Sequence, residues 1–310
     1  MHEPYIRDCL EGLLMQATTF PVQLLIHDDA STDGTARVLL EYKARYPDLI
    51  TVIQQSENQF SQGRMALIRR TLNDKTDGYY TAFCEGDDYW VAPDKLQRQV
   101  DFLEQNSDYA MVATDIILVD EKGGQIVDND MLLKKRELHK PGLVFHDLLH
   151  INFINTLTVC LRSKLLISLT KEAEERDIWY AIDQWFWLNI ALYHKIRLFN
   201  DITAAYRIHS SGISRDRDFI ARRVHYARYD TVKKYLLINN RILLAKEEKK
   251  KLTESIAMLM LSPWLLTSQK ALLLGKMLKH PGLATLIFGK IFSRGVIKLS
   301  NIFNGRRYNN

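Results

Sequence analysis

The chain has 310 residues, of which 46% are hydrophobic and 25% are charged, as in ordinary globular proteins. No apolar run approaches the roughly 18 residues that a membrane-spanning helix needs, and the polar start shows no signal peptide. Its three cysteines, Cys9, Cys84 and Cys160, lie far apart in the sequence and match neither a metal-ligand spacing nor a disulfide framework. This pattern predicts buried thiols in a reducing, cytoplasmic compartment.

The net charge of +5 is distributed unevenly along the chain. Residues 231–310 carry 15 Lys and Arg against 3 Asp and Glu, whereas residues 1–230 carry 27 against 34. We therefore predict two parts with different partners: a main domain over residues 1–218 and a basic, amphipathic helical region over residues 219–310.

Helices and strands alternate along the first 114 residues. The predicted elements are a helix over 5–16, a strand over 22–26, a helix containing Val38, Leu39 and Tyr42, a strand over 50–53, a helix over 64–72, a strand over 79–84, a helix containing Leu96, Val100 and Leu103, and a strand over 110–114. This order predicts an α/β fold with a mostly parallel sheet and helices on both faces.

The second half of the main domain is less regular. Residues 120–150 are polar and irregular, and the later elements are an outer strand over 156–161, an aromatic-rich helix over 183–192, a short strand over 196–199 and a loop over 206–214. From about residue 219 onward the sequence predicts helices alone.

Carboxylates cluster directly after two of the predicted strands. They are Asp28 and Asp29 in the first loop and Glu85, Asp87 and Asp88 in the second. Because ligands bind outside the carboxyl ends of parallel strands, the two loops should face one crevice. Crowded carboxylates repel each other and lose hydration, and a divalent cation held on phosphate oxygens would relieve both effects. The alternative for the first loop is a turn with a helix cap, which Ser31 or Asp33 would provide.

Four segments together resemble family 2 glycosyltransferases over about residues 3–215. They are Asp28-Asp29-Ala30-Ser31-Thr32-Asp33-Gly34-Thr35, Glu85-Gly86-Asp87-Asp88-Tyr89-Trp90, Ile182-Asp183-Gln184-Trp185 and Tyr206-Arg207-Ile208-His209. Each motif alone is weak, but four in this order and spacing are specific. The resemblance implies a GT-A fold and an inverting enzyme that moves a sugar from a nucleotide-sugar, expected to be a UDP-sugar, to a hydroxyl acceptor.

The resemblance also implies roles for individual residues. Asp28, Asp29, Asp88 and Arg207 are expected to bind the nucleotide, and Asp183 is expected to be the general base. The expected ligands of Mn²⁺ or Mg²⁺ are Asp87, Glu85 and His209.

Structural alternatives remain open for several of these residues. Asp183 could simply cap its helix, Arg207 could form a salt bridge within the fold, and His209 could be a packed histidine. Tyr89 and Trp90 fit packing under the acidic loop as well as sugar contacts.

One feature departs from the family pattern. Members usually begin with an apolar strand and a Pro-Thr-Tyr-Asn-like turn, whereas this sequence begins Met1-His2-Glu3-Pro4. Without that strand, two strands of the sheet lack a neighbour and leave backbone groups unpaired. Two explanations stay open: the true start lies upstream of Met1, or the chain is a truncated, non-catalytic remnant or scaffold of the same fold.

The basic C-terminal region favours helices lying on an anionic membrane surface, at the inner face of the cell membrane, which suits a saccharide or lipid-linked acceptor. A helical appendage packed on the main domain is the alternative. The basic residues match no nucleic-acid recognition motif, so nucleic acid is not an expected partner. A nucleotidyltransferase is also disfavoured, because no Gly- and basic-rich phosphate loop lies near the N-terminus. Surface polysaccharide assembly is the process that the family resemblance suggests.

Overall fold

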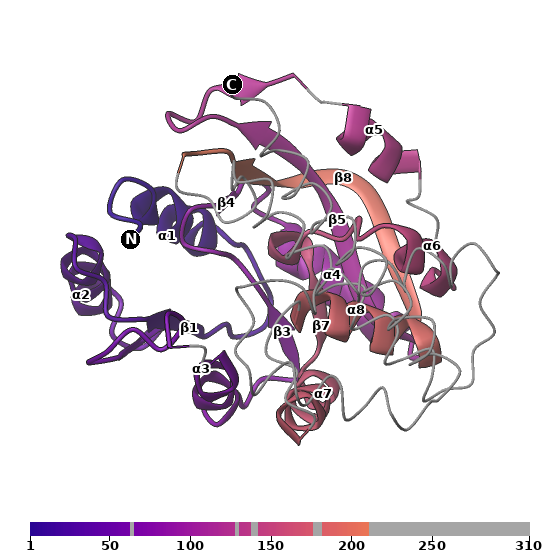
Figure 1. Cartoon of the computed structure of the whole chain (residues 1–310), viewed down its shortest axis with the longest axis horizontal. Helices are drawn as coiled ribbons and strands as arrows, with labels where there is room; N and C mark the ends of the chain where they lie inside the picture. Colours follow the sequence, from indigo (N-terminus) through magenta and orange to yellow (C-terminus); the bar gives the residue numbers. More distant parts are fainter. Residues whose placement is uncertain (63–64, 128–129, 138–141, 176–181, 211–310) are drawn as a thin grey trace, which may run out of the picture. The chain divides into compact units, whose positions relative to one another are not determined.

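The computed structural model describes residues 1–62, 65–127, 130–137, 142–175 and 182–210 (Figure 1). The expected boundary at residue 218 and the basic helical region of 219–310 lie outside these residues. Within the described part of the chain, no helix is both long and apolar enough to cross a membrane.

Eight α-helices are assigned within the described residues. They are α1 (Ile6–Leu14), α2 (Thr35–Arg45), α3 (Met65–Asn73), α4 (Lys95–Gln105), α5 (Asp130–Glu137), α6 (Phe145–His150), α7 (Ser163–Glu175) and α8 (Ile182–Tyr193), with a 3₁₀ turn over Thr156–Thr158. The first four confirm the helices expected from the apolar periodicity. The region 120–150, expected to be irregular, instead contains α5 and α6.

The strands follow the predicted order but differ in length. They are β1 (Leu24–Asp28), β2 (Ile50–Gln54), β3 (Tyr80–Ala82), β4 (Tyr89–Trp90), β5 (Tyr109–Val119), β6 (Gln125–Ile126), β7 (Cys160–Arg162) and β8 (Lys195–Arg207). Strand β8 continues through the start of the predicted loop over 206–214. The outer strand expected over 156–161 is mostly the 3₁₀ turn, and only its end belongs to β7.

The sheet is mixed rather than mostly parallel. Strands β1 and β2 pair in parallel as a separate two-stranded sheet, and the larger sheet has the order β3-β7-β5-β8-β4, with β6 paired to β5. In the larger sheet only β5 and β8 are parallel, and the other four pairs are antiparallel. The alternation of helices and strands predicted parallel pairing, but β7 lies between β3 and β5 and runs opposite to both, and β4 runs opposite to β8.

Strands β1 and β3 each lie at an edge of their sheet. Among the described residues, β1 pairs only with β2, and β3 pairs only with β7, so each has one edge without a strand partner.

Helix α1 packs closely against β4, and a glycine makes this possible. A Cβ atom on Gly12 would lie 2.7 Å from the carbonyl oxygen and 2.8 Å from the nitrogen of Trp90. Ile6, Cys9 and Leu10 of α1 form one apolar core with β1 and α2. This packing brings α1 against the acidic loop between β3 and β4.

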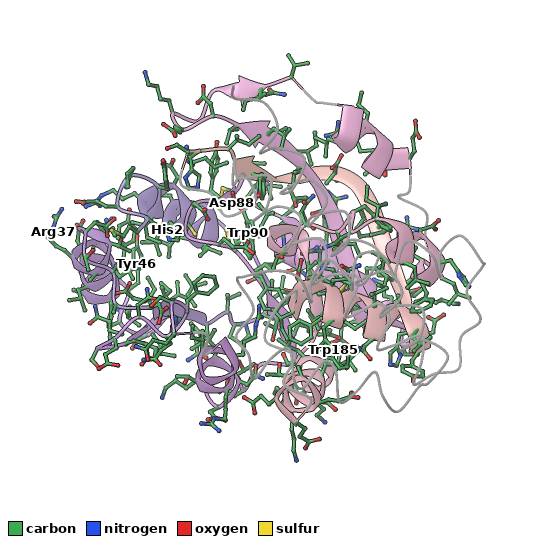
Figure 2. All side chains as sticks on the ribbon, in the orientation of Figure 1. His2, Arg37, Tyr46, Asp88, Trp90 and Trp185 are labelled. Carbon is green, nitrogen blue, oxygen red and sulfur yellow. The ribbon has the colours of Figure 1, made fainter. Side chains whose placement is uncertain are left out.

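Helix α8 is buried along most of its length, from residue 184 to residue 191. Trp185 and Trp187 are fully buried, and the Trp185 indole N–H donates to the carbonyl oxygen of Leu169 in α7 (Trp185 is labelled in Figure 2). A helix fixed so firmly gives Asp183, in its first turn, a defined position.

Candidate active site

The first acidic loop begins where β1 ends. Asp28 is 5% exposed, and its Oδ1 accepts a hydrogen bond of 3.3 Å from the N–H of Ser31. Both oxygens of Asp29 accept backbone N–H groups, from Gln59 and Phe60, at 2.8 Å each. Asp29 therefore ties the loop after β1 to the loop after β2, in addition to any role in ligand binding.

Two residues give this loop its local shape. Asp33 accepts from both the N–H and the hydroxyl of Thr35, the first residue of α2. The N-cap of α2 is Gly34, so neither Ser31 nor Asp33 occupies the capping position that the sequence suggested. Ala30 has φ of 59°, a left-handed conformation that is uncommon for a residue with a side chain. Strained backbone of this kind is found most often at ligand-binding sites.

The second acidic loop holds three carboxylates whose like charges repel one another. Burial, followed by the charge of Glu85, raises the pKa of Asp88 to about 8. Glu85 remains accessible to solvent but is surrounded by protein atoms, and this loss of hydration raises its pKa to about 7. The carboxylates of Asp87 and Asp183 raise the pKa of Glu85 further. The crowding predicted from the sequence is present in the fold.

His209 contacts this loop directly. Its ring is almost fully buried, its Nε2 lies 3.0 Å from Oδ2 of Asp87, and it packs against Tyr5 with 4.9 Å between ring centroids. The Nε2 atom of His2, which the sequence did not single out, lies 3.9 Å from the same Oδ2 atom of Asp87. Two imidazoles therefore approach Asp87 (His2 and Asp88 are labelled in Figure 2).

Arg207 forms extensive contacts within the fold. Its backbone N–H donates to Oδ1 of Asp88 at 2.7 Å, and its guanidinium donates to the carbonyl of Asp87 at 2.9 Å and to the carboxylate of Asp8 at 2.6 Å. The guanidinium also lies over the rings of Tyr5 and Tyr89. These bonds favour the alternative in which Arg207 fixes the acidic loop, and nucleotide binding by Arg207 stays a prediction.

Asp183 comes close to the acidic loop, although the two lie far apart in the sequence. The Oδ2 atom of Asp183 accepts a hydrogen bond of 3.0 Å from Asn152, and its charge acts on both Glu85 and Arg69. Arg69 belongs to α3, lies 5.2 Å over the ring of Phe186, and has a buried Nε without a hydrogen-bond partner among the described residues. Burial lowers the pKa of Arg69, whereas the carboxylates of Asp183 and Glu85 raise it.

Two cysteines lie beneath the acidic loop. The Sγ atoms of Cys9 and Cys84 are 3.7 Å apart, and that of Cys9 is 3.4 Å from the carbonyl oxygen of Glu85. Spacing could not indicate this proximity, because 75 residues separate the two cysteines in the sequence. Both are free thiols, and Cys9 is buried as predicted, whereas Cys84 is only half-buried. The hydrogen bond with Cys9, and then burial, raise the pKa of Cys84.

Comparison with known proteins identifies the family. The sequence model described as Glycosyl transferase family 2 matches residues 2–160. The chain belongs to glycosyltransferase family 2. The protein Rv1520 of Mycobacterium tuberculosis (strain ATCC 25618 / H37Rv), itself uncharacterised, is 34% identical over 214 residues, 68% of this chain and 57% of the relative. The chain therefore spans little more than half the length of that relative.

Two further similarities agree with the family. TuaG of Bacillus subtilis (strain 168), provisionally named a teichuronic acid biosynthesis glycosyltransferase, is 30% identical over 158 residues, 51% of this chain and 56% of TuaG. The crystal structure of GalNAc-T7 with UDP, GalNAc and Mn²⁺ superposes with a TM-score of 0.51 at 9% identity, covering 86% of this chain and 51% of that one. The expected GT-A-like α/β fold and membership of family 2 are thus confirmed.

The donor atoms of the acidic loop suit a hard divalent cation, although they do not form a closed cage. Among the described residues, no three His, Cys, Asp or Glu side chains are arranged to hold a metal by themselves. Asp87 and His209 nevertheless bring a carboxylate and an imidazole within 3.0 Å, and Mn²⁺ accepts both ligand types. A cation that also bound diphosphate oxygens would take its remaining ligands from the substrate.

Proposed function

We propose that this family 2 glycosyltransferase is metal-dependent and inverting, and that it transfers a sugar from a nucleotide-sugar, preferentially a UDP-sugar, to a hydroxyl of a saccharide or lipid-linked acceptor. The observation that supports this most strongly is that the charge of Asp183 acts on Glu85, the first carboxylate of the acidic loop, although the two residues lie far apart in the sequence. One carboxylate near a crowded acidic loop is the arrangement needed for a base beside a metal–diphosphate site.

In the proposed reaction, Asp183 accepts the proton of the acceptor hydroxyl. The acceptor oxygen forms a bond to the anomeric carbon of the donor, the bond from that carbon to the diphosphate oxygen breaks, and the electron pair leaves with the nucleoside diphosphate. Attack on the face opposite the leaving group inverts the anomeric centre.

The remaining site residues bind the donor. Asp28 and Asp29 accept hydrogen bonds from ring and ribose donors of the nucleoside, with Asp88 assisting. Asp87 and His209, with Glu85 beside them, would hold Mn²⁺ or Mg²⁺, which neutralises the charge developing on the departing diphosphate. The GalNAc-T7 structure, which contains both UDP and Mn²⁺, supports this combination of nucleotide and metal.

Calorimetric titration with UDP tests the donor site. We expect binding of UDP in the presence of Mn²⁺, loss of binding after chelation of the metal, and weakened binding after Asp87→Asn. Binding that survives chelation and the substitution unchanged would exclude the proposed metal site. Diphosphate release from a panel of UDP-, dTDP- and GDP-linked sugars then identifies the donor, and NMR of the product anomer tests inversion.

A non-catalytic member of the family is the second candidate. It is favoured by the engagement of both Asp29 oxygens and of the Arg207 guanidinium in contacts within the protein. The titration separates the candidates, because a scaffold would show no metal-dependent binding of UDP.

We propose that the enzyme acts in surface polysaccharide assembly at the membrane. The name of TuaG supports a role in surface polysaccharide assembly. The 15 basic residues against 3 acidic ones in residues 231–310 support peripheral binding of a cytoplasmic enzyme to the anionic inner face of the membrane. The intact protein should then bind vesicles containing phosphatidylglycerol but not pure phosphatidylcholine vesicles, and high salt should release it. Equal binding to both vesicles would contradict the electrostatic mechanism.

A further inference from the structure

Asn152 provides a neutral hydrogen-bond donor to Asp183. It follows α6 in the chain and lies 31 residues from Asp183, yet its Nδ2 donates to Oδ2 of that carboxylate at 3.0 Å. An amide side chain has no titratable proton, so this donor is present whether or not the neighbouring groups carry charge. The contact therefore constrains the direction of the carboxylate at every relevant pH.

The other end of the same side chain shows what this orientation costs. Oδ1 of Asn152 is buried and has no hydrogen-bond partner among the described residues. A buried carbonyl oxygen without a donor is unfavourable, because its hydration is lost and not replaced. Rotating the amide by half a turn would place Oδ1 against Oδ2 of Asp183, two acceptors facing each other. The carboxylate thus determines the amide orientation, and the fold tolerates the unpaired oxygen.

The surroundings of Asp183 are fixed from several elements. Gln184, the next residue in α8, donates from Nε2 to the carbonyl of Leu148 in α6 at 3.3 Å, so the start of α8 is tied to the helix that leads to Asn152. Arg69 of α3 supplies positive charge to Asp183, and Glu85 of the acidic loop supplies negative charge. These charged groups influence ionisation, whereas the Asn152 hydrogen bond sets direction.

We propose that Asn152 is a positioning residue, which holds the Asp183 carboxylate in the orientation needed to accept the proton of the acceptor hydroxyl. This inference rests on the proposed function, because it assumes that Asp183 is the base. A hydrogen bond to one carboxylate oxygen fixes the plane of the group and so the direction of the other oxygen. In this proposal Asn152 contacts neither the nucleotide-sugar nor the acceptor substrate, and it acts only through Asp183.

The test compares four variants: Asn152→Ala, Asn152→Asp, Asp183→Asn and the double variant Asn152→Ala with Asp183→Asn. Diphosphate release from the best nucleotide-sugar of the panel is measured with Mn²⁺. Asn152→Ala should lower kcat by about 10- to 100-fold, because a misplaced catalytic group loses about that much, while KM for the donor stays unchanged. Asp183→Asn should abolish activity, and the double variant should be no worse than Asp183→Asn alone.

Asn152→Asp preserves the shape of the side chain but replaces the donor by a second carboxylate. Mutual repulsion then favours protonation of one group of the pair, so the acidic limb of the rate profile should move to higher pH by more than about one unit. The matched control is Asn106→Ala, because Asn106 also donates its amide to a protein oxygen, the carbonyl of Phe102 at 2.8 Å, and lies at the end of α4. The control should keep the kcat and the pH profile of the wild type.

The outcomes distinguish the inference from the function on which it rests. If Asp183→Asn is inactive while Asn152→Ala has wild-type kcat, the base assignment stands and the positioning role is wrong. If Asp183→Asn retains activity, or if the wild type releases diphosphate from no donor, the proposed function fails and the inference falls with it. If Asn152→Ala does not fold, by circular dichroism, then a wild-type kcat and pH profile in Asn152→Asp would overturn the positioning role.

Discussion

Replacing Asp88 by Asn should stabilise the metal-free protein at neutral pH. Asp88 is 3% exposed, and burial followed by the charge of Glu85 raises its pKa from 3.8 to about 8. A carboxyl with a raised pKa in the fold binds its proton more tightly when folded than when unfolded. Stability is therefore highest below the unfolded pKa and falls as the pH rises from about 4 towards 8, where the folded group also ionises.

The size of the effect follows from the same shift. At pH 7 the unfolded carboxyl is ionised and the folded one is mostly protonated, which corresponds to about three pKa units, or at most about 4 kcal/mol at roughly 1.4 kcal/mol per unit. Because Asp88 and Glu85 titrate as a pair, we expect a gain of about 1 to 4 kcal/mol for Asp88→Asn. The asparagine oxygen still accepts the N–H of Arg207, so the bond of 2.7 Å is kept.

The assay is urea unfolding in chelator-containing buffer at pH 5, 6, 7 and 8. The advantage of Asp88→Asn over the wild type should grow with pH and shrink towards pH 4. The control is Asp101→Asn, an exposed position on α4, which should change stability by less than about 0.5 kcal/mol at every pH. An Asp88→Asn variant that is no more stable than the wild type at pH 8, or whose gain does not depend on pH, would refute the reasoning. Addition of UDP and Mn²⁺ should reverse the order, because only the wild type binds them fully.

Three other substitutions test separate parts of the structure. Gly12→Ala should destabilise the protein by about 2 kcal/mol or more in urea unfolding, because a Cβ would lie 2.7 Å from the backbone of Trp90, and wild-type stability would show that α1 and β4 are not in contact. Arg69→Met should lower activity and move the acidic limb of the pH–rate profile to higher pH, because Asp183 loses a neighbouring cation. Arg69→Lys should retain most activity. The same pH–rate profile in Arg69→Met and the wild type would rule out this electrostatic role. Burial lowers the pKa of Lys95 from 10.5 to about 8, so wild-type stability should rise between pH 8 and 10.5 from this group, and Lys95→Met should lack that rise in chemical unfolding at pH 8 and 10.

The parts of the fold that followed from the sequence are those with local signals. Helices α1 to α4 carry clear apolar periodicity, and the acidic residues stand directly after apolar runs, so their positions at strand ends could be predicted. The direction of strand pairing could not, because it depends on contacts between strands far apart in the sequence: the connection from β5 to β7 contains α5 and α6, yet these strands are antiparallel. The two residues of β4 give no periodic signal, and β8 continues to Arg207 because it pairs along nearly the whole length of β5.

In the candidate site, too, the sequence signals some residues, whereas only the fold shows the others. Some site residues belong to motifs that can be recognised in the sequence alone, namely Asp87, Asp88 and Asp183. Arg69 and Asn152 carry no such signal: Arg69 lies within an ordinary helical pattern, and Asn152 lies between the region expected to be irregular and the next predicted strand. Their significance comes from proximity to Asp183 in the fold, which neither spacing nor composition specifies.

Several residues of this site make interactions that are unfavourable for stability. Glu85 and Asp88 are held in surroundings where their charges are unfavourable, and Arg69 and Asn152 keep buried atoms without partners among the described residues. Stability alone would replace each with an apolar or neutral residue. The closeness of Glu85, Arg69 and Asn152 to the Asp183 carboxylate is explained if a metal–diphosphate and an acceptor hydroxyl complete the missing interactions during the reaction. It follows that substitutions in this group should lower activity while raising stability or leaving it unchanged. Gly12→Ala, by contrast, should lower stability. These opposite effects would distinguish residues kept for catalysis from residues that are only poorly packed.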